Sequence, residues 1–468
     1  MENKMKYIAV LLMFLTSACV VAGPPQPELR PDNLQLKQNT IPLMQSSRAI
    51  DHSYYAKSDF VDLTIPKDFQ FVNTVKLKYL LATGKWRDYA LFSDHLKKFN
   101  TTSNCKGRLK DFGIKSMTRE VSSREEDYAD AKKAGFRLII ICSEEVGGLI
   151  HLDYPWMADQ MAEIILHHAT ERNVIEDGVT HMPSQVQYAK YMVMAQTAEF
   201  YAYFKDLMPL TPEEHKIITA YFDEIFMGNI FHPQERRQQC NVNTPMLIAS
   251  SGEHGQHGCG TNGTAMLQAS IAYSLSTNNN KLFERAKANL TYWLGTFDND
   301  GIHVLQASRG ASLGYHHDIS IRLGSITEMM YALDYDFLEH TMPRSGIKVH
   351  DVLDTHFEAL NNHQLMAKYG RHNNGVWDKW SSIANMTTTE ANAYITGYDW
   401  WHIANANRRY VIKYRTEPTM MRGKLIDWQA HAKKDLIVGP DERVNAAGEF
   451  WKHALIPAQY MYEINQSR

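Results

Sequence analysis

The feature that most constrains the fold is a long succession of helical patterns with almost no strand patterns. From Phe69 onward, apolar residues recur at spacings of three and four, as on a helix that buries one face. About nine or ten helices are expected, over 85–99, 118–135, 156–172, 184–207, 212–227, 264–277, 280–297, 319–337, 349–369 and 388–410. Residues 136–142 are the best strand candidate, with the start of a buried helix as the alternative, and short strands are expected after Thr416.

This number of ordinary-length helices predicts an all-α fold, an (α/α) barrel or toroid with few strands. In such a fold an inner ring of helices surrounds a cleft, and loops at one end carry function. An irregular helical bundle is the alternative, and the absence of a heptad repeat excludes a coiled coil. We expect a single catalytic domain over residues 61–468, preceded by an extended arm over the Pro- and Gln-rich residues 23–60.

Three helix starts carry capping residues. Thr211 precedes Pro212, which suits the first helical position. Ser184 follows Pro183 and is expected to cap the next long helix, and Asn280 is expected to cap the helix over 280–297.

The first 22 residues resemble a signal peptide. Lys4 and Lys6 precede an apolar run over 7–15 that is too short to span a bilayer, and small residues allow cleavage after Ala22. Lipid attachment at Cys19 is the alternative. The protein is therefore expected to be exported, to the periplasm or outside the cell, and the remaining chain has no apolar run that indicates an integral membrane protein.

The net charge limits the classes of partner that are expected, and the cysteine content bears on the cellular compartment. The 468 residues carry a formal net charge of −3, which gives no basic excess for nucleic acid. Beyond Cys19, four cysteines remain, and an even number in an exported protein indicates disulfides. The pairing nearest in sequence is Cys105 with Cys142 and Cys240 with Cys259. Other connectivities and four free thiols stay open.

Candidate catalytic residues gather in two Gly-rich polar loops separated by two helical patterns. The first loop holds His254 and His257 just before Asn262, and the second holds Arg309, Tyr315 and His316. A cation beside a phenol stabilises the phenolate, so a tyrosine beside arginine can transfer protons near neutral pH. Histidine is the side chain most easily poised as a base at that pH. The alternatives are structural ion pairs, an Asn262 helix cap, and zinc bound by His254, His257 and Cys259.

The order of these residues resembles the core of alginate-lyase-type polysaccharide lyases with an (α/α) barrel. In that group an Asn-and-His segment opens one helix, and an Arg followed by Tyr-His comes some fifty residues later. Here Asn262 and Tyr315 are 53 residues apart, and the resemblance covers about 70 residues. The commonest form of the family has His directly after Asn, whereas Gly263 stands here. That departure indicates a divergent family whose base is His257 or His254.

The resemblance implies β-elimination on a uronic acid polymer of the alginate or glucuronan type, without a cofactor or a metal. Neutralising the carboxylate beside C5 makes the enolate-like intermediate accessible, a role expected for Asn262 and Arg309. Tyr315 is expected to protonate the leaving O4. It is also expected to act as the base when the C5 proton and O4 lie on the same face of the sugar. Otherwise His257 is the expected base, and His254 is the second candidate for that role.

Amide and aromatic side chains elsewhere are candidates for sugar binding. Gln187 and Tyr188 lie at a predicted helix start, His316 follows the candidate acid, and Trp400 and Trp401 offer faces on which sugar rings stack. The alternative is that at least half of the aromatic residues are buried packing residues.

Two rival functions stay open at this point. A glycoside hydrolase on the same scaffold would need paired carboxylates, for which Asp298, Asp300 and Asp399 are candidates, although 298–301 also resembles a turn. A non-catalytic glycan-binding envelope protein would use the aromatic residues and form no product. The clustering of Arg, Tyr and His favours an enzyme.

Overall fold

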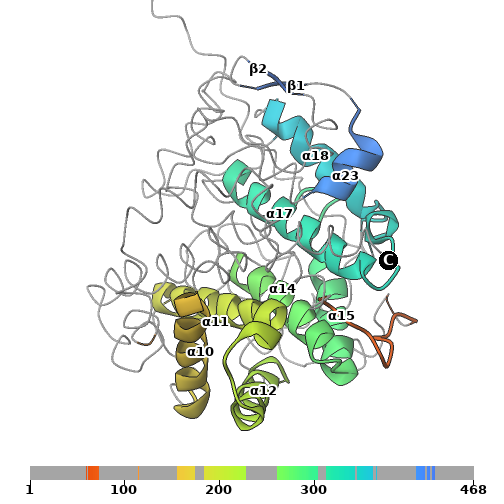
Figure 1. The fold of residues 1–468 in the computed structure, drawn as a ribbon. Helices are drawn as coiled ribbons and strands as arrows, with labels where there is room; N and C mark the ends of the chain where they lie inside the picture. The colour runs from red at the N-terminus through yellow and green to blue at the C-terminus, as the bar shows by residue number, and fades with distance from the viewer. Residues whose placement is uncertain are drawn as a thin grey trace, which may run out of the picture.

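The computed structural model describes residues 60, 62–72, 114, 155–173, 184–227, 261–303, 312–342, 345–361, 365, 407–416, 419–421 and 424–426 (Figure 1). The helices in these parts are α10 (Pro155–Thr170), α11 (Ser184–Phe204), α12 (Pro212–Met227), α14 (Thr261–Ser276), α15 (Asn280–Leu294), α17 (Ser312–Tyr331), α18 (Val349–Asn361) and α23 (Arg408–Tyr414). Short 3-10 helices cover η6 (Lys205–Leu207) and η8 (Phe337–Glu339), and the strands are β1 (Thr419–Met421) and β2 (Lys424–Ile426).

Three of these helices form an inner layer. Every side chain over 193–204 of α11, 264–275 of α14 and 319–330 of α17 is buried. A helix buried on all faces must be covered by neighbours on every side. Accordingly, α11 packs most extensively on α14, and α14 packs in turn on α17.

The other long helices form an outer layer with one apolar face each. In α12 the buried residues recur at alternating spacings of three and one, which is the pattern of a helix with one face toward the core. They are Ile218, Tyr221, Phe222, Ile225 and Phe226. Helix α12 contacts α10 and α15, and α18 packs on α17 (Figure 1).

The predicted all-α, (α/α)-type fold is confirmed in the part of the chain that the structure describes. Helices alternate between the two layers along the chain, and a three-residue turn over 277–279 joins the neighbours α14 and α15. The predicted helices over 85–99 and 118–135 and the predicted strand over 136–142 lie outside the described residues. The short strands expected after Thr416 are confirmed: β1 and β2 pair antiparallel, with Met420 opposite Leu425.

Thr211 caps α12, as predicted, and the structure adds Glu214 as its partner in a capping box. The Thr211 hydroxyl accepts a hydrogen bond from the Glu214 amide at 3.3 Å, and the Glu214 carboxylate accepts one from the Thr211 amide at 2.7 Å. The cap predicted for α15 was wrong by one residue. Asn279, rather than Asn280, accepts the Leu282 amide at 3.0 Å.

Asn280 instead binds the segment that precedes the helical body. Its side chain accepts a hydrogen bond from the Ile65 amide at 2.8 Å and donates one to the Ile65 carbonyl at 3.1 Å. Lys287, about two turns further along α15, is fully buried. Its ammonium group donates hydrogen bonds to the carbonyls of Phe60 at 2.8 Å and Leu63 at 2.6 Å. These contacts fix residues 60–65 against α15. The predicted arm over 23–60 lies almost wholly outside the described residues.

No helix among the described residues is long and apolar enough to cross a membrane.

Replacing Lys287 by methionine should destabilise the protein by about 2–4 kcal/mol, because the carbonyls of Phe60 and Leu63 would lose their buried donor. Urea unfolding measures the free energy. Lys216→Met is the matched control, since Lys216 is exposed and pairs with the exposed Glu213 at 3.1 Å, and it should cost less than about 1 kcal/mol. Equal losses in the two variants would contradict the docking role of Lys287.

Candidate active site

The predicted site residues that the structure describes lie at the starts of the three inner helices. Asn262 is the second residue of α14, and Tyr315 and His316 are the fourth and fifth residues of α17. Gln187 and Tyr188 lie in the first two turns of α11. His254, His257, Arg309, Trp400 and Trp401 lie outside the described residues, as do the five cysteines.

The prediction that Tyr315 and His316 belong to a loop was wrong. Helix α17 begins at Ser312 and includes Gly314, whereas the sequence placed the helix start at Ile319. Glycine weakens a helix by about 1 kcal/mol relative to alanine, but packing on neighbouring helices outweighs that preference. Tyr315 is therefore held on a helical turn.

The three inner helices run in the same direction. Along α11 and α14 the contacts advance together, from Glu199 with Gln268 to Tyr201 with Tyr273, whose ring centroids are 6.3 Å apart. Figure 1 shows α11 and α17 both running from left to right. The first turns of the three helices thus face the same end of the molecule, and we refer to residues 184–188, 261–264 and 312–316 as the rim.

A buried polar triad connects the inner helices below the rim. The Gln268 amide of α14 donates to the Glu199 carboxylate of α11 at 2.7 Å. The Arg322 guanidinium of α17 donates to the Gln268 oxygen at 3.5 Å, the outer limit for a hydrogen bond. All three side chains are buried, with exposed fractions of 4% for Glu199, 0% for Gln268 and 2% for Arg322. One amide therefore bridges a carboxyl group and a guanidinium inside the buried inner layer.

Burial changes the acidity of this triad. Desolvation raises the pKa of Glu199 to about 7, against the opposing effects of the Gln268 hydrogen bond and the Arg322 charge. Desolvation also raises the pKa of Tyr203, one turn further along α11, well above its ordinary value. Glu328 of α17, which acts on Tyr203, is itself paired with Arg409 at 2.8 Å. The pKa of Glu199 thus lies near neutral pH.

The triad lies on the C-terminal side of the rim in each helix. Tyr188 precedes Glu199 by 11 residues, Asn262 precedes Gln268 by 6, and Tyr315 precedes Arg322 by 7. At 1.5 Å per residue, these separations along α14 and α17 are about 9–10 Å. Positions 315 and 322 also share a face of α17, because seven residues complete nearly two turns.

His316, predicted as a sugar ligand, is fully buried. One ring nitrogen lies 3.2 Å from the Gly301 carbonyl, and the other lies 3.4 Å from His356 Nδ1 on α18. Desolvation lowers the pKa of His316 to about 4, so the ring is neutral at pH 7. Its contacts anchor the start of α17 to the 298–303 turn and to α18. The sugar-binding role stays a prediction.

The aspartates considered for hydrolysis form a turn. The Asp298 carboxylate accepts the amides of Asp300 at 3.0 Å and Ile302 at 2.9 Å. Gly301 follows with φ +76°, and a Cβ there would lie 3.1 Å from the Asp351 carbonyl. The carboxylate of Asp298 thus shapes the turn that supports His316. Asp399 lies outside the described residues.

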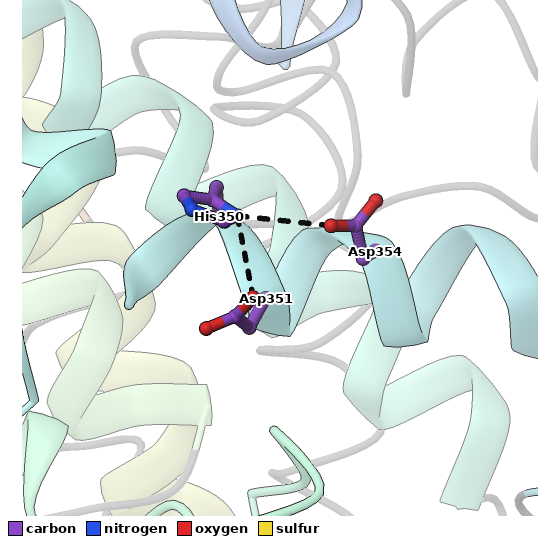
Figure 2. A group of neighbouring side chains, drawn as sticks. All are labelled: His350, Asp351 and Asp354. Atoms are coloured by element: carbon purple, nitrogen blue, oxygen red, sulfur yellow. Dashed lines mark ion pairs between the residues drawn. The ribbon is translucent and has the colours of Figure 1, made fainter. Parts of the chain in front are cut away.

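A second cluster of titratable side chains lies at the start of α18 (Figure 2). His350 Nδ1 is 3.4 Å from Asp351 and 3.7 Å from Asp354. Asp351 also accepts the Lys348 amide at 2.7 Å, and Asp354 accepts the Tyr410 hydroxyl. The carboxylates therefore cap the helix and bind α23, at a helix end whose dipole disfavours cations. Ion pairing and capping explain this cluster without a metal.

Comparison with known proteins yields a distant structural similarity. No protein-family model matches the sequence, and no curated protein matches it. Among solved structures, the chain is similar to a variant of alginate lyase A1-III complexed with a tetrasaccharide, with a TM-score of 0.40 and 14% sequence identity. The similarity covers 53% of this chain and 64% of that protein. It concerns helical scaffold alone, and no residue role is transferred from it.

Sequence reasoning missed the buried triad. Glu199 and Gln268 each lie within long apolar stretches, and Arg322 follows two isoleucines in α17. Polar residues at buried helix positions were the available signal. Their meeting depends on the packing of three helices from distant parts of the chain.

Glu199→Gln should remove a specific pH dependence of stability. Between pH 4.5 and about 7 the folded chain keeps a proton on Glu199 that the unfolded chain has released, so the wild type loses stability as pH rises through 7. The loss attributable to Glu199 is ~3 kcal/mol. Urea unfolding at pH 5 and pH 8 measures it as the difference between wild type and variant. Parallel pH profiles would show that Glu199 titrates normally.

Proposed function

We propose that this protein is a polysaccharide lyase that cleaves a uronic acid polymer of the alginate or glucuronan type by β-elimination. The observation that carries the proposal is the position of Asn262 and Tyr315 in the first turns of α14 and α17, two packed inner helices with their starts at the same end. Asn262 and Tyr315 thus lie on helix starts at the same end of the molecule, which supports their proposed common action.

The first step is neutralisation of the uronate carboxylate. Backbone amides at a helix start carry partial positive charge, and the starts of α14 and α17 both belong to the rim. Asn262 supplies an amide donor there, and Arg309, three residues before Ser312, supplies a full charge. Together these groups would stabilise the enolate-like intermediate that forms when C5 loses its proton.

The second step breaks the C5–H and C4–O4 bonds and forms the C4–C5 double bond. His257, or Tyr315 as phenolate, accepts the C5 proton, with His254 as the alternative histidine. Tyr315 gives a proton to O4 of the leaving sugar. Gln187, Tyr188, Trp400 and Trp401 are proposed to bind neighbouring sugars. Residues 1–22 are proposed to export the protein to the periplasm or beyond the cell, where such polymers occur.

The proposal predicts an unsaturated product. Incubation of the purified protein with alginate, glucuronan or another uronate should raise the ultraviolet absorbance, because the new double bond is conjugated with the carboxylate. Tyr315→Phe should lower kcat by about 10²–10⁴, since the proton donor is lost. Tyr331→Phe, at the opposite end of the same helix and 45% exposed, is the control and should retain activity.

The same assay separates the rivals. New reducing ends without ultraviolet absorbance would establish hydrolysis. Binding without any product would establish a glycan-binding protein. Either result would overturn the lyase proposal, as would full activity of Tyr315→Phe.

A further inference from the structure

We propose that Glu199, Gln268 and Arg322 are positioning residues that hold a pH-dependent positive charge beneath the rim, so that the anionic polymer binds more tightly when Glu199 is protonated. The inference rests on the proposed function, because it concerns binding of a polyuronate at the rim. It names a device that controls affinity, separate from the groups that transfer protons.

The geometry of the triad links its two charges through one amide. Gln268 is fully buried, donates through its nitrogen to Glu199 at 2.7 Å and accepts through its oxygen from Arg322 at 3.5 Å. An amide has distinct donor and acceptor ends, so this arrangement fixes the carboxyl group on one side and the guanidinium on the other. The two groups are therefore held on opposite sides of one side chain, inside the inner layer.

The ionisation of Glu199 decides the net charge of the triad. Arginine keeps its charge throughout the accessible pH range. With Glu199 protonated, the triad carries one positive charge, and with Glu199 ionised its net charge is zero. The burial-raised pKa of Glu199, about 7, puts this change near neutrality.

Three helices bring other polar groups toward Glu199. On α11, Tyr203 has a pKa raised well above its ordinary value and remains neutral. On α17, the Arg322 guanidinium lies on the other side of Gln268, and Glu328 is paired with Arg409 of α23 at 2.8 Å. On α14, the amide of Gln268 reaches Glu199 and does not titrate. The pH-dependent charge is therefore assigned to Glu199.

The position of the triad lets this charge act on the rim. The charge that changes is on Glu199, 11 residues and about 16 Å along α11 from Tyr188 at the rim. Residues 193–198 of α11, which lie between them, are buried, so salt screens this charge little. One unit charge at about 16 Å should change the affinity for a carboxylate roughly two- to six-fold at an effective dielectric constant of about 20–40.

Binding of fluorescently end-labelled mannuronate and glucuronate oligomers at pH 6 and pH 8 tests the inference. For the wild type, Kd should rise roughly two- to six-fold from pH 6 to pH 8. For Glu199→Gln, which keeps the shape and stays neutral, Kd should remain near the pH 6 value at both pH values. Comparing the two proteins removes the contribution of any histidine that titrates in this range.

Asp223→Asn is the matched control. Asp223 of α12 also has a pKa raised by burial, but it accepts hydrogen bonds from Tyr273 at 3.2 Å and Asn279 at 3.1 Å, near the C-terminal end of α14. Asp223 therefore lies on the side of the triad that is farther from the rim. This variant should keep the wild-type pH dependence of Kd.

The outcomes separate the inference from the proposed function. An equal rise in Kd for wild type and Glu199→Gln would overturn the inference, while formation of an unsaturated product would leave the lyase proposal intact. A pH dependence that Glu199→Gln removes, without any unsaturated product, would support the triad and overturn the lyase. Failure of both oligomers to bind at pH 6 would overturn both.

Discussion

The hydrogen bond between Glu199 and Gln268 is the interaction on which the inner layer depends. It joins two helices that are otherwise buried in apolar contact, and it satisfies a carboxyl group that would be costly to bury alone. An apolar helix pair can slide by one turn with little loss, whereas a single buried polar contact favours one register. With Arg322 added from α17, the same contact aligns all three inner helices.

That alignment explains how residues from distant segments reach one end of the molecule. Helices that run in the same direction and meet at the triad have their starts at the same end of the molecule. Tyr188, Asn262 and Tyr315 come from α11, α14 and α17, and each precedes the triad residue of its own helix. The outer helices complete the arrangement: α18 and the 298–303 turn hold the start of α17 through His316. Stability and the proposed chemistry thus share one scaffold.

Local sequence signals predicted local structure well. The cap at Thr211 and the bounds of α12 were predicted from residues near the helix ends, and both are confirmed. Either of two adjacent asparagines could have capped α15. In the structure Asn280 binds the backbone of Ile65, and Asn279 caps the helix by accepting the Leu282 amide. The start of α17 was misplaced because Gly314 breaks the helical pattern, and tertiary packing overrides it. The triad needed contacts between residues up to 69 positions apart, which periodicity does not encode.

The most direct test of the central claim is the mass of the products formed from a saturated uronate oligomer of defined length. β-Elimination divides the oligomer without adding water, so the fragment from the new non-reducing end should be lighter by one water than the corresponding saturated oligomer. We predict that lighter fragment, and its loss in Tyr315→Phe. Fragments that all carry the added water would show hydrolysis and would contradict the role assigned to the rim.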